Sequence, residues 1–523
     1  MRDKEGIINT LLDQAELAVC GKTKEFGASR TKTAIKGNLS KSVIDRVKQE
    51  VASVPVNGQS AEAKRALAGC KEELLDGTLL FPRFNPSRHI PVEILHTFLL
   101  GVIKYLWYET TKDMKPDILD RFGSRLNDLS HRSIVGSKTS LAKYIVKYSN
   151  SLIGRHFKEI IQLGAFALDG LPGVSPELFN LWIDLGRLTS LVWFAQITDM
   201  ERYLRYLRRA SGNVLDGFAK LFPAKILRKV KLHLLAHLEE DVVAFGPLVG
   251  ESAERFESFN AVFRQSVVFS NRKNTSRDVA FDCAEQERVR MAMSGGYIRE
   301  RRVTEQGTEQ TSWRPPSDRI ISLLEGSGFL KKQFALWYPK EAPGNVVKAT
   351  RKQKPGDDLV SRLSSISNGA EFPDVVESPH FAQPCSQVSS REGDRCSEGT
   401  WVFALAAAEP LAGRISRIFL HAEQSYFIVD HFTVDEEQGL ERRFKMPVLK
   451  SSGRSVLIQG ENLLYDFNVQ EIAGKFLVNL HSLHHQDLLY GTLRPELLNI
   501  RLYLYCLIIF IRVTTICIIH VMV

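Results

Sequence analysis

The sequence predicts a mainly α-helical protein with a small C-terminal β domain, so that the fold is α+β overall. Apolar residues recur with a helical period through the centre of the chain, from about residue 81 to residue 310. After residue 400 the pattern changes to short alternating runs separated by Gly and acidic turns. The chain has 523 residues, of which 44% are hydrophobic, which is enough for several domains with their own cores.

Helical patterns account for the first three hundred residues. Residues 1–80 are predicted to form a polar helical segment, and residues 81–310 a helical block. One apolar face with a 3.6-residue period predicts a helix over residues 92–114, and it consists of Leu95, Leu99, Val102, Ile103 and Leu106. Further helical patterns cover about residues 139–170, 176–210 and 213–240.

The composition changes twice in the last two hundred residues. Pro, Ser, Gly and charged residues dominate much of residues 311–400, which predicts a linker that is partly disordered. Residues 401–485 are predicted to form a small β domain that could be barrel-like. Its expected strands are 414–420, 426–432, 443–449 and 455–458.

The C-terminal segment, residues 500–523, is the compositional outlier. Residues 502–523 are almost wholly apolar, and a membrane span needs about 20 such residues. Arg512 stands at the centre of the segment, where a charge is costly in a bilayer. We prefer the interpretation that this chain end did not belong to the original domain. The alternative is a tail anchor that places the protein in a membrane.

Charge and cysteine usage narrow the function classes. The net charge of +9 favours a polyanionic partner such as nucleic acid or an anionic membrane surface. The seven cysteines are scattered and contain no C-x-x-C, which excludes a zinc module of that type and indicates a reducing compartment. The sequence also lacks G-x-S-x-G, H-E-x-x-H and a complete phosphate-binding loop.

Two acidic segments carry the candidate chemistry. Glu93 and His96 stand three residues apart at the start of the first expected helix of the block, where they can share one side of a turn. Glu254 and Glu257 are neighbours on a later helix, which Phe256 and Phe259 are expected to anchor in a core. A metal site would need such acids on packed helices. A helix-terminal acid beside a half-buried histidine, and a solvated acidic face, would give the same patterns.

A histidine pair and two basic stretches complete the candidates. His233 and His237 have the i, i+4 spacing of a metal pair but lack the intervening Glu of H-E-x-x-H. Basic side chains with interleaved aromatic residues could contact phosphates, although a solvated helix face would look alike. The DNA-binding candidates are Arg205, Arg208, Arg209, Lys225, Arg228, Lys229, Arg264, Arg272, Lys273 and Arg277.

An ordered set of motifs resembles fungal transposon-encoded proteins related to the transposases of CACTA (En/Spm-like) elements. The resemblance covers about residues 80–300, and Asp466-Phe467-Asn468-Val469-Gln470 resembles a later motif of those proteins. The motifs are Pro91-Val92-Glu93-Ile94-Leu95-His96-Thr97, Leu100-Gly101, Lys231-Leu232-His233, His237-Leu238, Phe245-Gly246-Pro247, Glu257-Ser258-Phe259-Asn260, Ser270-Asn271-Arg272 and Ser276-Arg277-Asp278.

The resemblance implies an RNase H-like nuclease ancestor with an acidic triad that holds two divalent metal ions. By position, Glu93 and His96 match its acid–histidine motif and Glu257 its final acid, with Glu254 as the competitor. Glu93 and Glu257 would then be metal ligands, and residues 97–250 the helical insertion. Mg²⁺ or Mn²⁺ would be the ion, because carboxylates suit hard cations and two such ions stabilise phosphodiester cleavage.

Two departures from the family pattern limit the expected activity. The family has Asp where this chain has Glu93, and its first catalytic Asp should lie well upstream, whereas Asp13 and Asp45 lie in polar helical sequence. We therefore expect a degenerate or truncated transposase relative that binds DNA in the nucleus without autonomous strand transfer. A domesticated DNA- or chromatin-binding protein without catalysis, and a tail-anchored membrane protein, are the alternatives.

Overall fold

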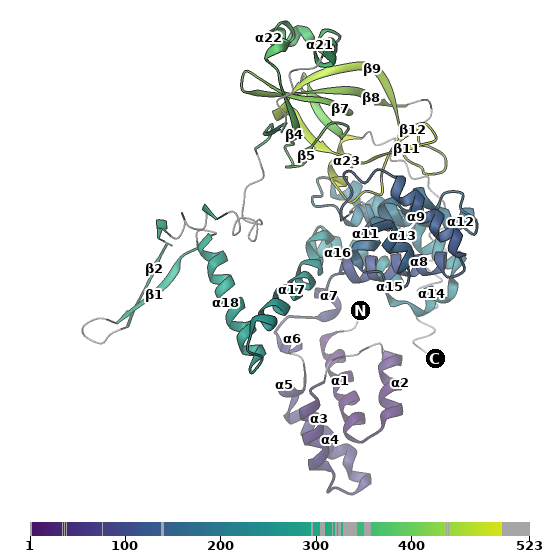
Figure 1. The fold of residues 1–523 in the computed structure, drawn as a ribbon. Helices are drawn as coiled ribbons and strands as arrows, with labels where there is room; N and C mark the ends of the chain where they lie inside the picture. The colour runs from purple at the N-terminus through teal and green to yellow at the C-terminus, as the bar shows by residue number, and fades with distance from the viewer. Residues whose placement is uncertain are drawn as a thin grey trace. The chain divides into compact units, whose positions relative to one another are not determined.

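Helices precede a curled antiparallel sheet in the computed structural model of the chain (Figure 1). The structure describes residues 3–493, except for 34, 36, 38, 76, 137–140, 294–295, 304–308, 316, 320–321, 323–325, 328–341, 350–356, 436 and 438. The predicted fold class, mainly α with a small C-terminal β domain, is confirmed. The chain divides into two compact units, and Glu93 begins the second.

The first unit contains Met1–Val92 and the short stretch Val243–Phe245. Apolar side chains of α1, α3 and α4 form its core, with Ala15, Val47 and Leu67 almost completely buried. Asp3 caps the first helix, because its side chain accepts a hydrogen bond from the backbone N–H of Gly6. The helices up to residue 92 are α1 (Lys4–Val19), α2 (Thr23–Thr33), α3 (Lys41–Val51), α4 (Val56–Gly69), α5 (Lys71–Leu74), α6 (Gly77–Leu80) and α7 (Pro86–His89).

The second unit begins with a helical block around two apolar helices. Helices α11 and α12 are buried over most of their length, and α12 starts with Ser175 as its cap and Pro176 as its first residue. The elements are η1 (Leu95–Ile103), α8 (Lys104–Thr111), α9 (Pro116–Asp128), α10 (Leu141–Lys147), α11 (Gly154–Leu168), α12 (Pro176–Val192), α13 (Met200–Leu221), α14 (Pro223–Arg228), α15 (Val230–Leu234), η2 (Leu235–His237) and α16 (Leu238–Phe245).

The end of the helical region is a pair of longer helices. A 3₁₀ turn, η3 (Leu248–Glu251), precedes α17 (Glu254–Phe269) and α18 (Thr275–Met293), which contact each other. A two-stranded antiparallel ribbon follows and consists of β1 (Ile298–Val303) and β2 (Glu309–Arg314).

The first helix of the block differs from the continuous α-helix expected over residues 92–114. Its first part, η1, has the wider π-helical turn, and the α-helical part α8 starts only at Lys104. A side chain at Gly101 would come within 2.6 Å of the carbonyl oxygen of His96, so glycine permits this close backbone path. Wide turns of this kind often occur at functional sites, and here one carries His96.

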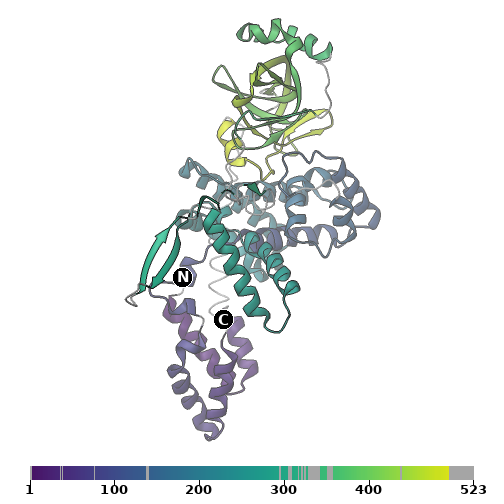
Figure 2. The same ribbon diagram turned by 60° about the vertical axis from the view of Figure 1, so that its left-hand side comes forward.

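The C-terminal part of the second unit is built on one curled sheet (Figures 1 and 2). Among the described residues this sheet has ten strands, and its main path runs β10-β6-β7-β8-β9-β12-β11. The strands are β3 (Val346–Lys348), β4 (Gln383–Ser389), β5 (Arg395–Cys396), β6 (Trp401–Ala406), β7 (Glu409–His421), β8 (Gln424–Val434), β9 (Val448–Gln459), β10 (Leu463–Asp466), β11 (Val469–Ile472) and β12 (Lys475–Val478).

Alternating residues cover the two faces of this sheet with different cores. On β8, Phe427 and Val429 join one cluster, whereas Tyr426 and Ile428 pack on the other face against Leu359 of α21. The helices beside the sheet are α21 (Asp357–Ser364), α22 (Pro373–Glu377) and α23 (Gln486–Thr492), and the 3₁₀ turns are η5 (Gly369–Glu371), η6 (Pro379–Phe381) and η7 (Gly460–Asn462).

The sheet extends beyond the boundaries expected from the sequence. Strand β4 pairs with β7 and with β3, so the β domain includes residues that were expected in the linker 311–400. Of the runs expected as two strands, 455–458 and the last two residues of 443–449 lie in one strand, β9, whereas residues 443–446 lie outside any strand. The expected barrel-like form is not closed among the described strands, because β10 and β11 end the pairing path.

A buried polar network joins the end of the sheet to the helical block. The side chain of Gln470 donates to the carbonyl oxygen of Ser130 (2.8 Å), and the side chain of Asn468 donates to that of Arg132 (2.7 Å). The side chain of Asn479 donates to the carbonyl oxygen of Gln162 on α11, at 3.1 Å. Since buried amides are costly when they lack partners, these contacts fix the register between the two regions.

Candidate functional site

Glu93 lies at the start of η1 and accepts four hydrogen bonds. Its Oε1 atom accepts from the backbone N–H of Leu95 (2.7 Å) and of Ala253 (2.8 Å). Its Oε2 atom accepts from the backbone N–H of His96 (2.7 Å) and lies 2.8 Å from Nδ1 of the same residue. Ala253 caps α17, so Glu93 connects the starts of two helices that are distant in sequence.

His96 continues this connection to Glu257. Its Nε2 atom lies 2.9 Å from Oε1 of Glu257, and both side chains are about half exposed. The structure therefore brings Glu93, His96 and Glu257 together, and we call these three residues the acid–histidine cluster. The roles expected for them in catalysis and metal binding stay predictions.

The electrostatic state of Glu93 follows from its donors. Burial alone would raise its pKa, but the backbone N–H groups of Ala253, His96 and Leu95 and the His96 side chain hold the pKa of Glu93 below its usual range. A carboxylate that already accepts four hydrogen bonds is a poor direct ligand. Within the cluster, Nε2 of His96 and the carboxylate of Glu257 are the groups left to face an ion, with Glu93 orienting the imidazole.

Glu254 has a different partner. Its carboxylate pairs with Nζ of Lys158 on α11, and the ammonium group of Lys158 lies 5.4 Å from the ring centre of Trp193. Glu254 thus anchors the first turn of α17 to the helical block. Phe256, which was expected in a core, is instead 82% exposed, because α17 turns this side chain to the solvent.

Three lysines form a basic surface near the acid–histidine cluster. The side chain of Lys231 passes over Gly101, where a Cβ atom would lie 2.7 Å from its Cδ. Burial, together with the nearby charges of Lys104 and Lys229, lowers the pKa of Lys231, and Glu93 acts in the opposite direction. Lys104 and Lys229 are exposed. We call Lys104, Lys229 and Lys231 the lysine surface.

The residues predicted to bind DNA differ in their partners and in their exposure. Those with partners inside the chain include Arg205, which pairs with Glu201, Arg208 with Glu239, and Lys225 with Glu109. Arg209 is half-buried on α13. The exposed members are Arg228, Lys229, Arg264, Arg272, Lys273 and Arg277, together with Arg205 and Arg208.

The histidine pair on α15 and η2 is close enough to interact. Nε2 of His233 and Nε2 of His237 lie 3.3 Å apart, and Nδ1 of His237 lies 3.2 Å from Oε2 of Glu240. Burial and the neighbouring His237 lower the pKa of His233. A metal-binding role for this pair stays a prediction. In the described part of the chain, a larger group of side chains that could hold a metal ion lies elsewhere.

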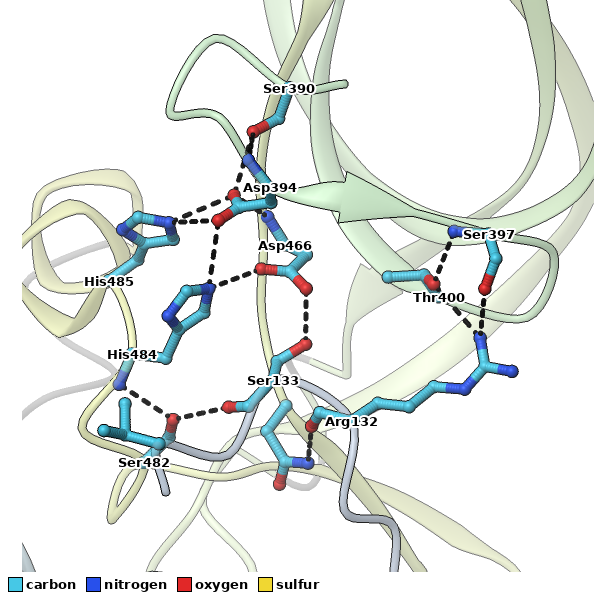
Figure 3. Close-up of polar contacts among 12 residues, drawn as sticks. Arg132, Ser133, Ser390, Asp394, Ser397, Thr400, Asp466, Ser482, His484 and His485 are labelled. Atoms are coloured by element: carbon cyan, nitrogen blue, oxygen red, sulfur yellow. Dashed lines mark hydrogen bonds and ion pairs between the residues drawn. The ribbon is translucent and has the colours of Figure 1, made fainter. Parts of the chain in front are cut away.

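That cluster contains Asp394, Asp466, His484 and His485 (Figure 3), and we call it the aspartate–histidine cluster. One ligand atom from each residue lies within 4.8 Å of all the others. Nε2 of His484 is 2.6 Å from Oδ1 of Asp466 and 3.3 Å from Oδ1 of Asp394. Nε2 of His485 is 2.9 Å from Oδ1 of Asp394.

Four separate parts of the fold position these residues. Asp394 lies in the turn between β4 and β5, and Asp466 is the last residue of β10. His484 and His485 precede α23, and His485 caps this helix with a left-handed backbone (φ 49°). The hydroxyl group of Ser133, between α9 and α10, donates to Oδ2 of Asp466 at 2.7 Å. The cluster therefore depends on the sheet and on the helical block.

The charges inside the aspartate–histidine cluster support one another. Burial alone would raise the pKa of Asp394, but hydrogen bonds from His484 and His485 hold it well below its usual range. Burial alone would lower the pKa of His484, but its hydrogen bonds to Asp394 and Asp466 raise this pKa to about 9. The cluster thus favours cations, whether protons or a metal ion.

A cavity of about 410 Å³ opens beside the two histidines. Trp193, Gln196, Glu392, His484 and His485 contribute to its wall. It gives the cluster a route to the solvent.

The sequence patterns did not predict this cluster. Asp466 belongs to a motif of the transposase resemblance, but Asp394, His484 and His485 belong to none of the predicted site patterns. The two aspartates lie far from the adjacent histidines in the sequence, so the four residues do not form a compact metal-binding motif. Only the fold brings them together. Their one visible signal was the repeated polar pattern of Asp466, Asn468 and Gln470 in an otherwise apolar strand region.

Comparison with known proteins adds one family. Residues 345–470 match the model described as "Domain of unknown function (DUF8590)". The matched part runs from β3 into β11 and includes Asp394 and Asp466, whereas His484 and His485 follow it. No curated protein and no solved structure matches the chain.

Membrane insertion was the alternative for the end of the chain. In the described part of the chain, no helix combines the length and the apolar character that a bilayer crossing requires. Residues 502–523, on which the alternative depends, lie outside the described residues.

Proposed function

We propose that this chain is a transposon-derived DNA-binding protein that keeps part of an ancestral two-metal cleavage site without autonomous strand transfer. The observation that supports it best is the contact of His96 with Glu257, beside the lysine surface. These two residues match the acid–histidine motif and the final acid of the transposase pattern that the sequence resembles. The proposal places the protein in the nucleus, where its partner would be.

The lysine surface supports binding of a phosphate backbone. Lys104 and Lys229 are exposed, and Lys231 carries its charge close to both. Crowded ammonium groups repel one another, and this cost is relieved when a polyanion replaces the repulsion with attraction. Lys229 also lies 5.1 Å from the ring centre of Tyr105, which restrains its side chain.

The turn between α17 and α18 supplies a second basic region. Arg272 and Lys273 are exposed there, with Arg264 exposed on α17. Arg277 lies 5.5 Å from the ring centre of Phe281, which is 60% exposed. Exposed guanidinium groups beside aromatic rings suit contacts with phosphates and with unstacked bases.

The geometry of the acid–histidine cluster supports binding without cleavage. A two-metal reaction needs several carboxylates around ions that lie about 3.5–4 Å apart. Glu93 is saturated with donors, and Glu254 is paired with Lys158. Mg²⁺ or Mn²⁺ at this place would be held by His96 and Glu257, a set that falls short of such a site.

The test of DNA binding is the salt dependence of affinity. Binding of the full chain to a 20-base-pair duplex is measured by fluorescence anisotropy at several salt concentrations. The variant Lys104→Gln/Lys229→Gln/Lys231→Gln should bind more weakly, and the slope of log K against log salt should fall by about 2–3. The control variant Lys24→Gln/Lys450→Gln/Lys475→Gln replaces three exposed lysines elsewhere and should change little.

Two outcomes would contradict the proposal. Absence of salt-dependent binding, or equal slopes for the two triple variants, would remove the DNA partner from this surface. Nicking of supercoiled DNA with Mg²⁺ or Mn²⁺ that disappears in Glu257→Gln would overturn the non-catalytic part. We expect wild type and Glu257→Gln to show the same background in that assay.

A further inference from the structure

We propose that Asp394, Asp466, His484 and His485 bind one divalent transition-metal ion of the zinc type, which ties together the end of the β domain. This site is independent of the proposed DNA surface and of the acid–histidine cluster. One ligand atom of each residue lies within 4.8 Å of the others (Figure 3). We assign Oδ1 of each aspartate and Nε2 of each histidine to the ion, because these atoms make the contacts between the residues.

The spacing of the four atoms suits a single small ion. Ligands about 2.0–2.2 Å from a tetrahedral zinc ion are about 3.4 Å from one another. The separations of 2.6, 2.9 and 3.3 Å between histidine nitrogens and aspartate oxygens are shorter than this distance, and all four ligand atoms lie within 4.8 Å of one another. Side-chain shifts of about 1 Å would bring them to the spacing around one ion. The Nε2 atoms of His484 and His485 approach the same oxygen, Oδ1 of Asp394, from two sides.

The outer oxygen of each aspartate is held by the protein. Oδ2 of Asp466 accepts from Ser133 at 2.7 Å, and Oδ2 of Asp394 accepts from the hydroxyl of Ser390 at 2.9 Å. The backbone N–H of Asp466 also donates to Oδ2 of Asp394, at 3.3 Å. These donors leave Oδ1 of Asp466 aimed at His484, which is how outer residues orient metal ligands. His485 lies against both oxygens of Asp394, at 2.9 Å from Oδ1 and 3.0 Å from Oδ2.

The donor set identifies the class of ion. Two imidazole nitrogens and two carboxylate oxygens suit zinc and its first-row neighbours, whereas Mg²⁺ and Ca²⁺ prefer sites made of oxygens. The side chains are mostly shielded, with exposed fractions of 11% for Asp394, 12% for Asp466, 19% for His485 and 27% for His484. The adjacent cavity provides access for the ion.

The ligands come from three segments of the chain, and the hydrogen bonds between strands connect these segments only partly. Asp394 lies after β4, Asp466 ends β10, and the two histidines follow β12, while Ser133 reaches in from the helical block. One ion would therefore cross-link the β domain at the place where it meets the helices. Ion pairs between charged histidines and the aspartates could hold the same geometry, and the experiment must separate these two cases.

Zinc binding to the full chain tests the proposal. The protein is treated with a chelator, and Zn²⁺ is titrated in by calorimetry with a competing chromophoric chelator. We expect one ion per chain at this site, a rise in the unfolding temperature with Zn²⁺, and no comparable effect of Mg²⁺. His484→Gln and His485→Gln should each weaken this binding at least about ten-fold.

Control variants separate this site from other histidines. His380→Gln alters an exposed histidine of the same domain and should leave binding unchanged. His233→Gln/His237→Gln removes the other histidine pair and should not affect the high-affinity event. If the ion is lost with that pair and kept in His484→Gln, or if Zn²⁺ does not bind the wild type, the proposal is wrong.

A milder variant keeps the test valid where a ligand substitution disturbs folding. Ser133→Ala removes only an outer hydrogen bond, so the chain should fold while zinc affinity falls by about ten-fold or more. Co²⁺ supplies a direct readout, because a tetrahedral site with nitrogen and oxygen ligands gives strong visible absorption bands. Wild-type protein that binds Co²⁺ without such bands would contradict the proposed tetrahedral site.

Discussion

The hydroxyl group of Ser133 donates a 2.7 Å hydrogen bond to Oδ2 of Asp466, across 333 positions of the sequence. Ser133 reaches this place with a left-handed backbone conformation (φ 57°), which non-glycine residues seldom adopt. Such strain persists only where the surroundings impose it. The loop after α9 is therefore shaped by the β domain, and the second unit depends on both regions.

Asn479 should be essential for the stability of this joint. Its side-chain amide donates to the carbonyl oxygen of Gln162 (3.1 Å) and to Oδ1 of Asn468 (2.8 Å), and the residue is fully buried. Asn479→Leu would leave both acceptors buried without this donor. We expect the free energy of unfolding to fall by about 3 kcal/mol, measured by urea denaturation followed by tryptophan fluorescence.

The matched control for Asn479→Leu is Asn180→Leu on α12. Asn180 is exposed, so the same chemical change should alter the free energy of unfolding by less than about 0.5 kcal/mol. Equal effects of the two variants would show that the buried network does not hold the regions together.

Local patterns were sufficient for much of the fold and for one part of the acid–histidine cluster. The helical period around Leu95 and Leu99 predicted a helix, and the spacing of Glu93 and His96 placed them on one turn, because both are properties of neighbouring residues. The approach of Glu257 depends on tertiary structure, and only the resemblance to a family suggested it. Sequence periodicity also could not show that η1 would be π-helical.

The rest of the architecture depended on contacts between distant segments. Strand β4 has the sequence Gln-Pro-Cys-Ser-Gln-Val-Ser, which carries little strand signal, and pairing with β7 makes it part of the sheet. Phe256 was expected to anchor its helix in a core, yet α17 leaves it exposed. The aspartate–histidine cluster was not predicted because its members lie on separate segments, which only the tertiary fold brings together.

His481 should make the protein less stable in acid. Complete burial is the main cause that lowers its pKa to about 3, against about 6.5 in the unfolded chain. Between these two values the unfolded state binds a proton that the folded state excludes, so stability falls as pH falls from about 6.5 towards 3. In this range His481 lowers the free energy of unfolding by about 1.4 kcal/mol for each pH unit. Above about pH 6.5 His481 causes no such pH dependence.

This pH dependence is measured by urea denaturation between pH 4.5 and 7.5. His481→Leu should flatten the acid side of the profile, whereas His380→Leu, which alters an exposed histidine, should keep the wild-type slope. A profile for His481→Leu that parallels that of the wild type would show that His481 does not cause the loss.

Gly186 should not tolerate a side chain. A Cβ atom at this position of α12 would lie 2.6 Å from Cγ of His481, whose ring is fully buried and cannot move away. Gly186→Ala should therefore lower the free energy of unfolding by about 1–3 kcal/mol, despite the better helix propensity of alanine. The control Gly491→Ala in α23 meets nothing within 4 Å and should be neutral or stabilising, by up to about 1 kcal/mol. Similar effects at both positions would contradict the steric explanation.

Glu93 should hold α17 in place, independently of any role in binding an ion. Its Oε1 atom joins Leu95 to Ala253, so Glu93→Gln would place an amide N–H₂ group against backbone donors that now meet carboxylate oxygens. We expect hydrogen exchange to accelerate about ten-fold or more in the first turns of α17, which corresponds to about 1.4 kcal/mol of lost local stability.

Glu257→Gln is the matched comparison for Glu93→Gln. It alters an exposed carboxylate at the other end of the same contact chain and leaves the hydrogen bonds of Glu93 intact. Hydrogen exchange in α17 should then stay close to that of the wild type, although His96 loses a charged partner. Acceleration by Glu257→Gln and not by Glu93→Gln would mean that His96 and Glu257, rather than the saturated carboxylate of Glu93, attach this helix to the block.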